Sequence, residues 1–250
     1  AGALFPARET VKVRRTRGRA ASHQETGEGR SQLAPLMERE AYDFARRRFA
    51  GRDPAEMAAR SGARLEGDGG SLMLPFLGRT YAVSFPSGEV AGRGGGGGDT
   101  PLVLKALLLH YLVGAGGVPI RGEWLPFHDL PGGEHRYGLF RHRAIGPIAR
   151  FFGQRPDLLP SAAARLGGRP ASIGRVGAVV PAFPLVPLGI ALWEGDEEVP
   201  PSANVLFDTS APCHLPTEDL ERVAFFCTDW LLEEGRRLAQ EQSPQDRPSG

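Results

Sequence analysis

The spacing of apolar and polar residues predicts three helices in the first half of the chain. Apolar positions within Pro35–Phe49 recur at helical intervals, as on the buried face of an amphipathic helix. A second helix is expected to begin at Asp53, because an Asp cap, a following Pro and a nearby Glu favour a helix start, and to end at Gly62. The run Pro101–Val113 is apolar on nearly all sides, which indicates a buried central helix.

Apolar runs of β-favouring residues predict strands. The first two, Ser71–Leu77 and Arg79–Phe85, are joined by a turn at Gly78. Pro75 has no amide proton for a sheet ladder, so the first strand is predicted to lie at an edge or to carry a bulge. Three later runs predict neighbouring strands of a buried sheet: Val176–Phe183, Leu188–Trp193 and Ala203–Phe207.

Helical spacing returns on both sides of this second set of strands. An apolar stripe runs through Arg136–Phe152, and Gly146-Pro147 should kink the helix or split it in two. A short helix is expected at Asp157–Leu166. The last helix opens at Thr217, with two acidic residues in its first turn, where they suit the helix dipole.

Together these elements predict a single α+β domain with a mainly antiparallel sheet, a buried central helix and a packed C-terminal helix. The domain is expected to span residues 33–240, with a glycine-rich loop at 92–98 inside it. Residues 1–32 are polar and basic with little periodicity, so they are predicted to form a disordered arm, and residues 241–250 a disordered tail.

Composition excludes several classes of protein. No apolar run approaches the roughly 18 residues that a membrane helix needs, so no membrane association is expected. The arginines do not form one stripe with interleaved aromatic residues, so nucleic-acid binding is not expected either. Cys213 and Cys227 are the only cysteines, which is typical of a reducing cytoplasm, and no Cys-x-x-Cys sequence is present for an iron–sulfur cluster.

Charge divides the second half of the chain. Glu134–Arg175 carries eight arginines and two acidic residues, whereas Val176–Glu221 carries eight acidic residues and no lysine or arginine. Such a division indicates either charge-complementary parts that pack together or a polarised cleft.

Several short motifs resemble the prokaryotic family known as domain of unknown function 3786. The motifs occur in this order: Leu109-His110-Tyr111-Leu112, Gly122-Glu123-Trp124, Leu130-Pro131-Gly132-Gly133, Leu192 to Glu198, Leu206-Phe207-Asp208 and His214 to Asp219. The likeness covers roughly residues 38–232, and the acidic block is its most specific part. It implies a cytoplasmic protein of a family frequent in anaerobes. Some members carry or neighbour a four-cysteine iron–sulfur module that this chain lacks, so cluster binding does not carry over. The family implies no established activity, cofactor or catalytic residue.

The best candidate site lies where the predicted strands end. The motif Leu130-Pro131-Gly132-Gly133 predicts a tight turn. If the strand ends meet at one rim that faces this turn, they form a ligand site whose residues are Trp124, Gly132, Gly133, Trp193, Glu194, Asp196, Asp208 and His214. Within it, Glu197, Asp208 and His214 could hold a metal ion, because carboxylates and an imidazole suit divalent metals. The alternative is a solvated acidic loop that pairs with the arginines.

Three functions remain open at this point. The first is a cytoplasmic protein of anaerobic metabolism that binds a small molecule or cofactor. The second is a metal-assisted or acid–base enzyme that uses the acidic cluster. The third is an accessory subunit whose acidic face docks a basic protein partner.

Overall fold

The computed structural model describes residues 27–67, 70–93, 100–195 and 198–242, with side chains from residue 35 onward. Residues Met37–Gly250 cluster as one compact unit and Ala1–Leu36 as another. The predicted disordered arm (1–32), glycine-rich loop (92–98) and tail (241–250) fall mostly outside the described residues, although residues 27–32 are helical and helix α7 includes residues 241 and 242.

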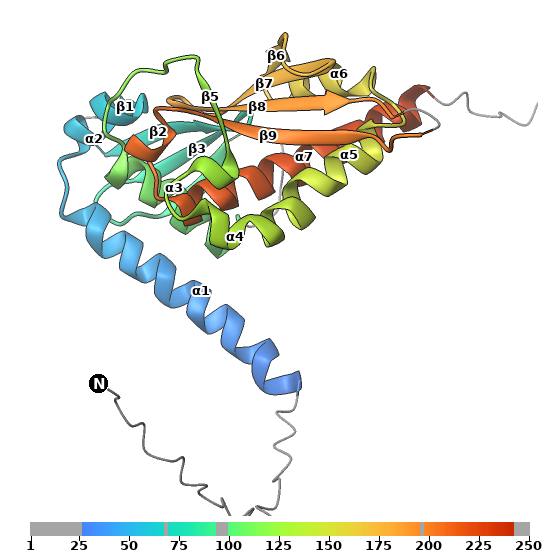
Figure 1. Cartoon of the computed structure of the whole chain (residues 1–250). Helices are drawn as coiled ribbons and strands as arrows, with labels where there is room; N and C mark the ends of the chain where they lie inside the picture. Colours follow the sequence, from blue (N-terminus) through green and yellow to red (C-terminus); the bar gives the residue numbers. More distant parts are fainter. Residues whose placement is uncertain (1–26, 68–69, 94–99, 196–197, 243–250) are drawn as a thin grey trace, which may run out of the picture. The chain divides into compact units, whose positions relative to one another are not determined.

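The described residues combine helices with two antiparallel sheets, which confirms the predicted α+β class (Figure 1). The α-helices are α1 (Gly27–Ala50), α2 (Pro54–Ser61), α3 (Leu102–Gly114), α4 (Gly133–Phe140), α5 (Gly146–Phe152), α6 (Leu158–Arg165) and α7 (Thr217–Gln242). Single turns of other helix types are η1 (Phe127–Asp129), the π-helical η2 (Arg141–Ile145) and η3 (Ala211–Cys213).

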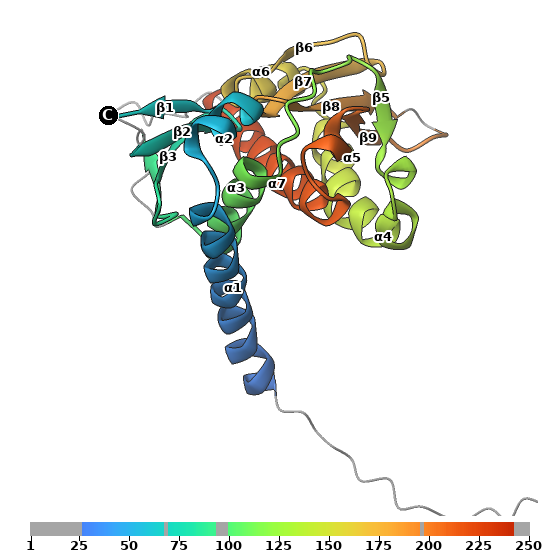
Figure 2. The same cartoon turned by 90° about the vertical axis from the view of Figure 1, so that its left-hand side faces the viewer.

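The strands form a sheet A and a sheet B. Sheet A has the order β1-β2-β3-β4, with bounds Arg64–Glu66, Ser71–Phe76, Arg79–Ser84 and Val90–Arg93. Sheet B has the order β5-β9-β8-β7-β6, with bounds Trp124–Pro126, Ser202–Asp208, Val186–Trp193, Val176–Phe183 and Arg169–Pro170. Helices α4, α5 and α7 lie on one side of sheet B, and α3 lies between sheet A and α7 (Figures 1 and 2).

Helix boundaries follow the local signals in the sequence. The side chain of Asp53 accepts a hydrogen bond from the amide of Glu56 at 2.9 Å, and Gly62 ends α2 in the left-handed conformation with φ 72°. The predicted first helix is confirmed, but it begins earlier than predicted, at Gly27. The sequence did not indicate the first turns of this helix, because they carry no apolar stripe. The predicted kink at Gly146-Pro147 corresponds to the π-helical turn η2 just before it.

Helix α3 is the buried central helix that the sequence predicts. Tyr111 is fully buried, stacks on Phe183 of β7 with ring centroids 4.0 Å apart, and donates a hydrogen bond to the carbonyl of Ser61 at 2.8 Å. Its hydroxyl also accepts a hydrogen bond from the amide of Leu185 at 3.2 Å. One aromatic side chain therefore joins α3 to α2 and to the turn between β7 and β8.

The edge position predicted from Pro75 is wrong for strand β2, which lies between β1 and β3. Strand β1 pairs only with residues Ser71, Leu72 and Met73, so Pro75 lies beyond its end and faces no strand on that side. The missing amide proton is therefore tolerated within a central strand. Strands β1, β4 and β6 were not predicted, because each is too short to show an alternating pattern.

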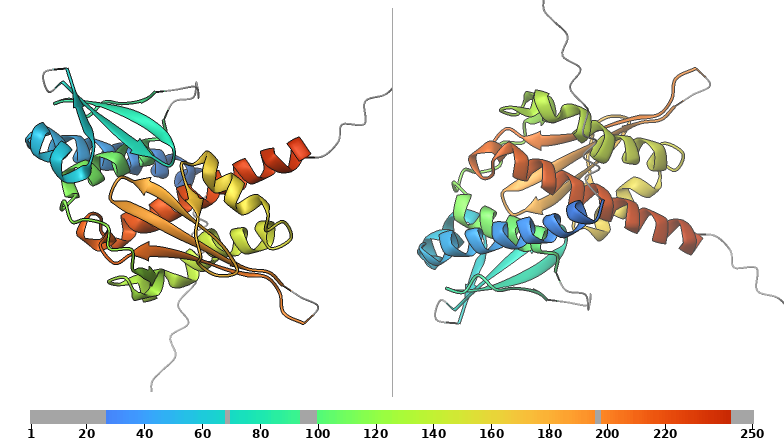
Figure 3. Two further views of the ribbon diagram at one scale, coloured as in Figure 1. Left: turned by 90° about the horizontal axis from the view of Figure 1, so that it is seen from above. Right: turned by 90° about the horizontal axis from the view of Figure 1, so that it is seen from below.

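The outer face of sheet B is covered by side chains. Small residues such as Gly189 alternate along β8 with the buried core residues Leu188, Ile190 and Leu192. A Cβ atom at Gly189 would lie 3.1 Å from the ring of Trp124 and 3.2 Å from Ile173, so these two side chains lie directly over the glycine. Figure 3 (left) looks onto this face, with α7 behind the strands. Trp124 therefore packs on the sheet.

Replacing Gly189 with Val should push Trp124 off the sheet. We expect the free energy of unfolding to fall by about 2 kcal/mol, because the added atoms overpack a filled contact. Urea unfolding followed by tryptophan fluorescence measures it. Gly138→Ala is the matched control, because a Cβ there meets nothing within 4 Å and the residue lies in a helix. Equal stability of the two variants would contradict this account of Trp124.

Candidate functional site

Asp208 is buried at the end of β9 and is held by four hydrogen bonds. Its Oδ1 accepts from the amide of Ser210 at 2.9 Å, from the hydroxyl of Ser210 at 2.6 Å and from the amide of Arg121 at 3.1 Å. Its Oδ2 accepts from the amide of Gly122 at 2.6 Å. The carboxylate thus joins the end of β9 to the loop that precedes β5.

These hydrogen bonds determine the ionisation of Asp208. Burial alone would raise the pKa of the carboxyl, but the hydrogen bonds from Ser210, Arg121 and Gly122 outweigh burial and hold the pKa below its ordinary value. The charged form is therefore the one that the fold stabilises, and its acceptor positions are directed at backbone and hydroxyl donors.

His214 lies six residues beyond Asp208 and is buried. Neither ring nitrogen has a hydrogen-bond partner of good geometry among the described residues, although the backbone of Val118 approaches the ring. Its ring centroid is 6.5 Å from that of Tyr111. Burial lowers the pKa of His214, and the nearby backbone of Val118 and charge of Asp208 oppose that shift only in part.

The loop 115–123 covers both residues. Its entry packs closely on the chain before α7, since a Cβ at Gly114 would lie 3.0 Å from the carbonyl oxygen of His214 and one at Gly116 would lie 2.6 Å from that of Cys213. Trp124 follows the loop and pairs in register with Asp208. We refer to Trp124, Asp208, His214 and the loop 115–123 as the β9 corner.

A second polar cluster lies at the start of α7. Asp219 is buried, with Oδ2 2.9 Å from Nδ1 of His110, and its Oδ1 accepts from Arg222 at 2.7 Å. Glu221 is also buried and accepts two hydrogen bonds from the guanidinium of Arg136. We refer to these five residues as the α7 cluster. The His110–Asp219 pair has the geometry that orients an imidazole as a proton acceptor.

The predicted glycine turn packs against this helix start. Thr217, the first residue of α7, donates its hydroxyl hydrogen to the carbonyl of Pro131 at 2.7 Å. Gly132 has φ 74°, and a Cβ at Gly133 would lie 2.0 Å from the carbonyl oxygen of Phe127, so both positions favour glycine. The turn therefore lies beside the start of α7, and Thr217, which it contacts, is three residues along the chain from His214.

The predicted single rim does not form. Trp193 pairs with Ser202 and Trp124 pairs with Asp208, so the two tryptophans are six residues apart along β9, or about 20 Å. Strands β8 and β9 are antiparallel, and their C-terminal ends therefore lie at opposite ends of the sheet. Glu194 accompanies Trp193 at the far end, where it lies 3.7 Å from Arg175 in an exposed ion pair.

The described acidic residues of Val176–Glu221 likewise do not gather in one place. Asp196 and Glu197 lie outside the described residues. In the described part of the chain, no group of three or more His, Cys, Asp or Glu side chains is arranged to hold a metal ion. The metal site predicted from Glu197, Asp208 and His214 therefore remains a prediction. Three acids of the block are buried inside the fold rather than presented on a face: Asp208, Asp219 and Glu221.

Sequence reasoning missed the contacts that bring these residues together. The backbone amides of Arg121 and Gly122 leave no side-chain signal, and the pairing of His110 with Asp219 joins residues 109 positions apart. Ser210 could have been found, because Asp-Thr-Ser after a strand is typical of a turn in which the Asp side chain accepts from the backbone two residues later.

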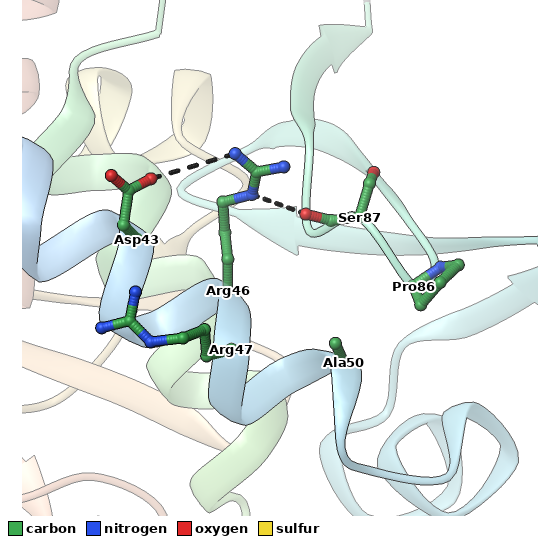
Figure 4. A pocket seen from close by; sticks show the side chains of 6 residues that line it. All are labelled: Asp43, Arg46, Arg47, Ala50, Pro86 and Ser87. Atoms are coloured by element: carbon green, nitrogen blue, oxygen red, sulfur yellow. Dashed lines mark hydrogen bonds and ion pairs between the residues drawn. The ribbon is translucent and has the colours of Figure 1, made fainter.

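An open hollow of about 390 Å³ lies elsewhere, between α1 and the β3–β4 turn (Figure 4). It is lined by Asp43, Arg46, Arg47, Ala50, Pro86 and Ser87. The guanidinium of Arg46 donates to the carbonyl of Ser87 at 2.6 Å and lies 3.9 Å from Asp43, so this cation is already engaged. None of the predicted ligand residues that the structure describes lines the hollow.

Replacing Asp208 with Asn should detach the loop 115–123. We expect the free energy of unfolding at pH 7 to fall by about 3 kcal/mol. The neutral amide of Asn is a weaker acceptor than the carboxylate, and its NH₂ group would face the N–H and O–H groups that donate to Asp208. The depressed pKa means that the wild-type contribution persists above the ordinary Asp value of about 3.9 and is lost as pH falls through the lower folded value.

Denaturant unfolding between pH 2 and 7 measures both effects. The exposed Asp157, whose side chain makes no cap hydrogen bond, supplies the control Asp157→Asn. An Asp208→Asn protein as stable as this control at pH 7 would show that the carboxylate does not hold the corner.

Replacing His214 with Phe should stabilise the protein. We expect a gain of about 1 kcal/mol at pH 7, because two buried unpaired nitrogens are removed. Because the pKa of His214 is lower in the folded protein than in the unfolded chain, the unfolded chain binds a proton more readily. The wild type therefore loses stability below about pH 6.5, and the difference in stability between the variant and the wild type grows. Unfolding at pH 7 and pH 5 tests this, with the exposed His142→Phe as control. A destabilised His214→Phe would contradict it.

Comparison with known proteins gives the family but no activity. A family model described as Domain of unknown function (DUF3786) matches residues 53–228, a span that contains the β9 corner and the five residues of the α7 cluster. A search of curated proteins and a search of solved structures each return no match. No helix in the described part of the chain has the length and apolar character needed to cross a membrane. On the extent of the match, the chain belongs to the DUF3786 family.

Proposed function

We propose that this protein binds a small molecule or cofactor in the cytoplasm, as part of anaerobic metabolism, and that it recognises the ligand at the β9 corner. The cytoplasmic and anaerobic setting rests on the family resemblance and on the two cysteines, which are both free thiols. The place of binding rests on one observation, the buried imidazole of His214, whose ring nitrogens have no hydrogen-bond partner of good geometry among the described residues.

An imidazole in this state is costly to keep. A buried polar group without a partner costs about 1–3 kcal/mol, and an apolar side chain of similar shape would avoid that cost. Folded proteins satisfy nearly all such groups, so the exceptions call for an explanation in function. A neutral imidazole offers one donor and one acceptor, which suits a small ligand that carries both.

The surroundings of His214 support a site that a ligand can enter. The loop 115–123 covers the imidazole, begins next to Gly114 and contains Gly116 and Gly117, and is held to β9 through the carboxylate of Asp208. Glycines allow such a segment to change conformation at low cost. Trp124 lies at the end of the same loop and offers the face or edge of a flat ring for contact with a ligand.

The remaining predicted ligand residues do not contact the ligand in this proposal. Gly132 and Gly133 shape the turn that holds Thr217, and this contact positions the chain that follows His214. Trp193 and Glu194 lie about 20 Å away along the sheet and are not part of the β9 corner. A protein partner at the acidic face would have to use exposed acids such as Glu194 and Glu218.

Recovery of a bound molecule tests the proposal. Purified protein is incubated with a cell extract prepared without oxygen and re-isolated, and its small molecules are identified by mass spectrometry. We expect the wild type to retain one compound near stoichiometrically and His214→Phe to lose it, because the ring nitrogens are gone while the fold is kept.

Trp193→Ala is the matched control, since this tryptophan is 44% exposed and lies at the far end of sheet B. It should retain the compound. No compound above background on the wild type, or equal retention by His214→Phe, would contradict the proposal.

A further inference from the structure

The division of charge along the sequence is only partly neutralised in the fold. Glu134–Arg175 carries eight arginines, which could pack against the acidic residues that follow them in the chain. Three of the eight form ion pairs with glutamates of the described residues. The other five are exposed and form no ion pair in the described part of the chain: Arg141, Arg143, Arg150, Arg155 and Arg169.

Arg155 lies next to an arginine from a distant part of the sequence. Helices α5 and α7 run side by side, as Figure 1 and Figure 3 (right) show. The guanidinium of Arg155, just after α5, lies 5.8 Å from the ring centre of Phe151. The guanidinium of Arg236, on α7, lies 6.0 Å from the same ring centre. One half-buried aromatic side chain thus brings two exposed cations together.

Two further arginines extend this surface along the helical segment that ends in α5. The guanidinium of Arg143 lies 4.6 Å from the ring centre of Phe225 on α7, and Arg150 lies about 10 Å further along the segment. Asp229 is the acidic neighbour: burial raises the pKa of its carboxyl, and the charges of Arg143 and Arg236 lower it. One carboxylate leaves the positive charges in excess. We refer to Arg143, Arg150, Arg155 and Arg236 as the basic face.

The spacing of the basic face suits a chain of anions better than a single anion. A lone phosphate is held by donors that converge within hydrogen-bond distance, whereas these guanidiniums are spread over about 10 Å or more. A nucleic-acid strand carries one negative charge for each nucleotide, and guanidiniums pair well with phosphate oxygens. A flexible single strand can adjust its phosphates to arginines that come from two helices at unequal spacing.

We propose that the basic face binds the phosphate backbone of a single-stranded nucleic acid. The sequence argued against nucleic-acid binding because its arginines form no stripe with interleaved aromatic residues. The fold supplies that arrangement, since it sets Phe151 and Phe225 among arginines of both helices. Contacts to phosphate carry little sequence information, so we expect little preference among sequences. The basic face shares no residue with the β9 corner, and this inference is independent of the proposed ligand site.

Binding of a fluorescein-labelled, single-stranded RNA of about 20 nucleotides, followed by fluorescence anisotropy, tests the proposal. If the four arginines neutralise four phosphates, the dissociation constant should rise about 50-fold between about 50 and 200 mM salt. Arg143→Gln combined with Arg236→Gln should weaken binding and reduce that rise to about sevenfold, because two charges are lost. Arg150→Gln combined with Arg155→Gln should do the same, which keeps the test decisive if the first pair unfolds the protein.

The control removes the same charge outside the basic face. Arg169→Gln combined with Arg175→Gln changes two exposed arginines in and beside the edge strand β6 of sheet B, and should leave binding unchanged. Unlabelled single-stranded DNA should displace the RNA far better than a poly-glutamate peptide of equal charge. Three results would overturn the proposal: no binding by the wild type, equal weakening in the control, or displacement by poly-glutamate as effective as by DNA.

Discussion

A buried carboxylate holds together the part of this fold that we assign to function. Asp208 accepts hydrogen bonds from Ser210 on its own turn and from two backbone amides of the loop before β5. Those contacts fix where the loop 115–123 lies, and the loop in turn covers His214. The position of Trp124 over the outer face of sheet B depends on the same junction, because Trp124 pairs in register with Asp208.

The β9 corner combines one group that stabilises the fold with one that destabilises it. The depressed pKa of Asp208 reflects a charge that the fold prefers, whereas the depressed pKa of His214 reflects burial that disfavours its charged form. Both groups weaken the corner as pH falls, the imidazole first and the carboxylate in stronger acid.

The elements of this fold are largely visible in the sequence. The cap at Asp53, the apolar run of α3 and the strands around Gly189 follow from local spacing, and each is present in the structure. What spacing cannot give is the direction in which neighbouring strands run. Trp193 and Asp208 each end a strand, and only the antiparallel register of β8 and β9 shows that these ends are about 20 Å apart.

The candidate site was only partly predictable for a related reason. Asp208, His214 and Trp124 could be named from their residue types and their places after strands. The groups that orient them, the amides of Arg121 and Gly122, carry no side-chain chemistry and become visible only in three dimensions. The α7 cluster likewise depends on a contact between His110 and Asp219 that no local pattern encodes.

The central claim is that His214 is held neutral inside the β9 corner, without a hydrogen-bond partner of good geometry among the described residues. Nuclear magnetic resonance of the ring nitrogens, recorded as pH is lowered, tests it most directly. We predict that His214 stays neutral below about pH 6.5, the ordinary pKa of an imidazole, because burial lowers the pKa of this ring. Protonation of His214 at or above about pH 6.5 would contradict the account.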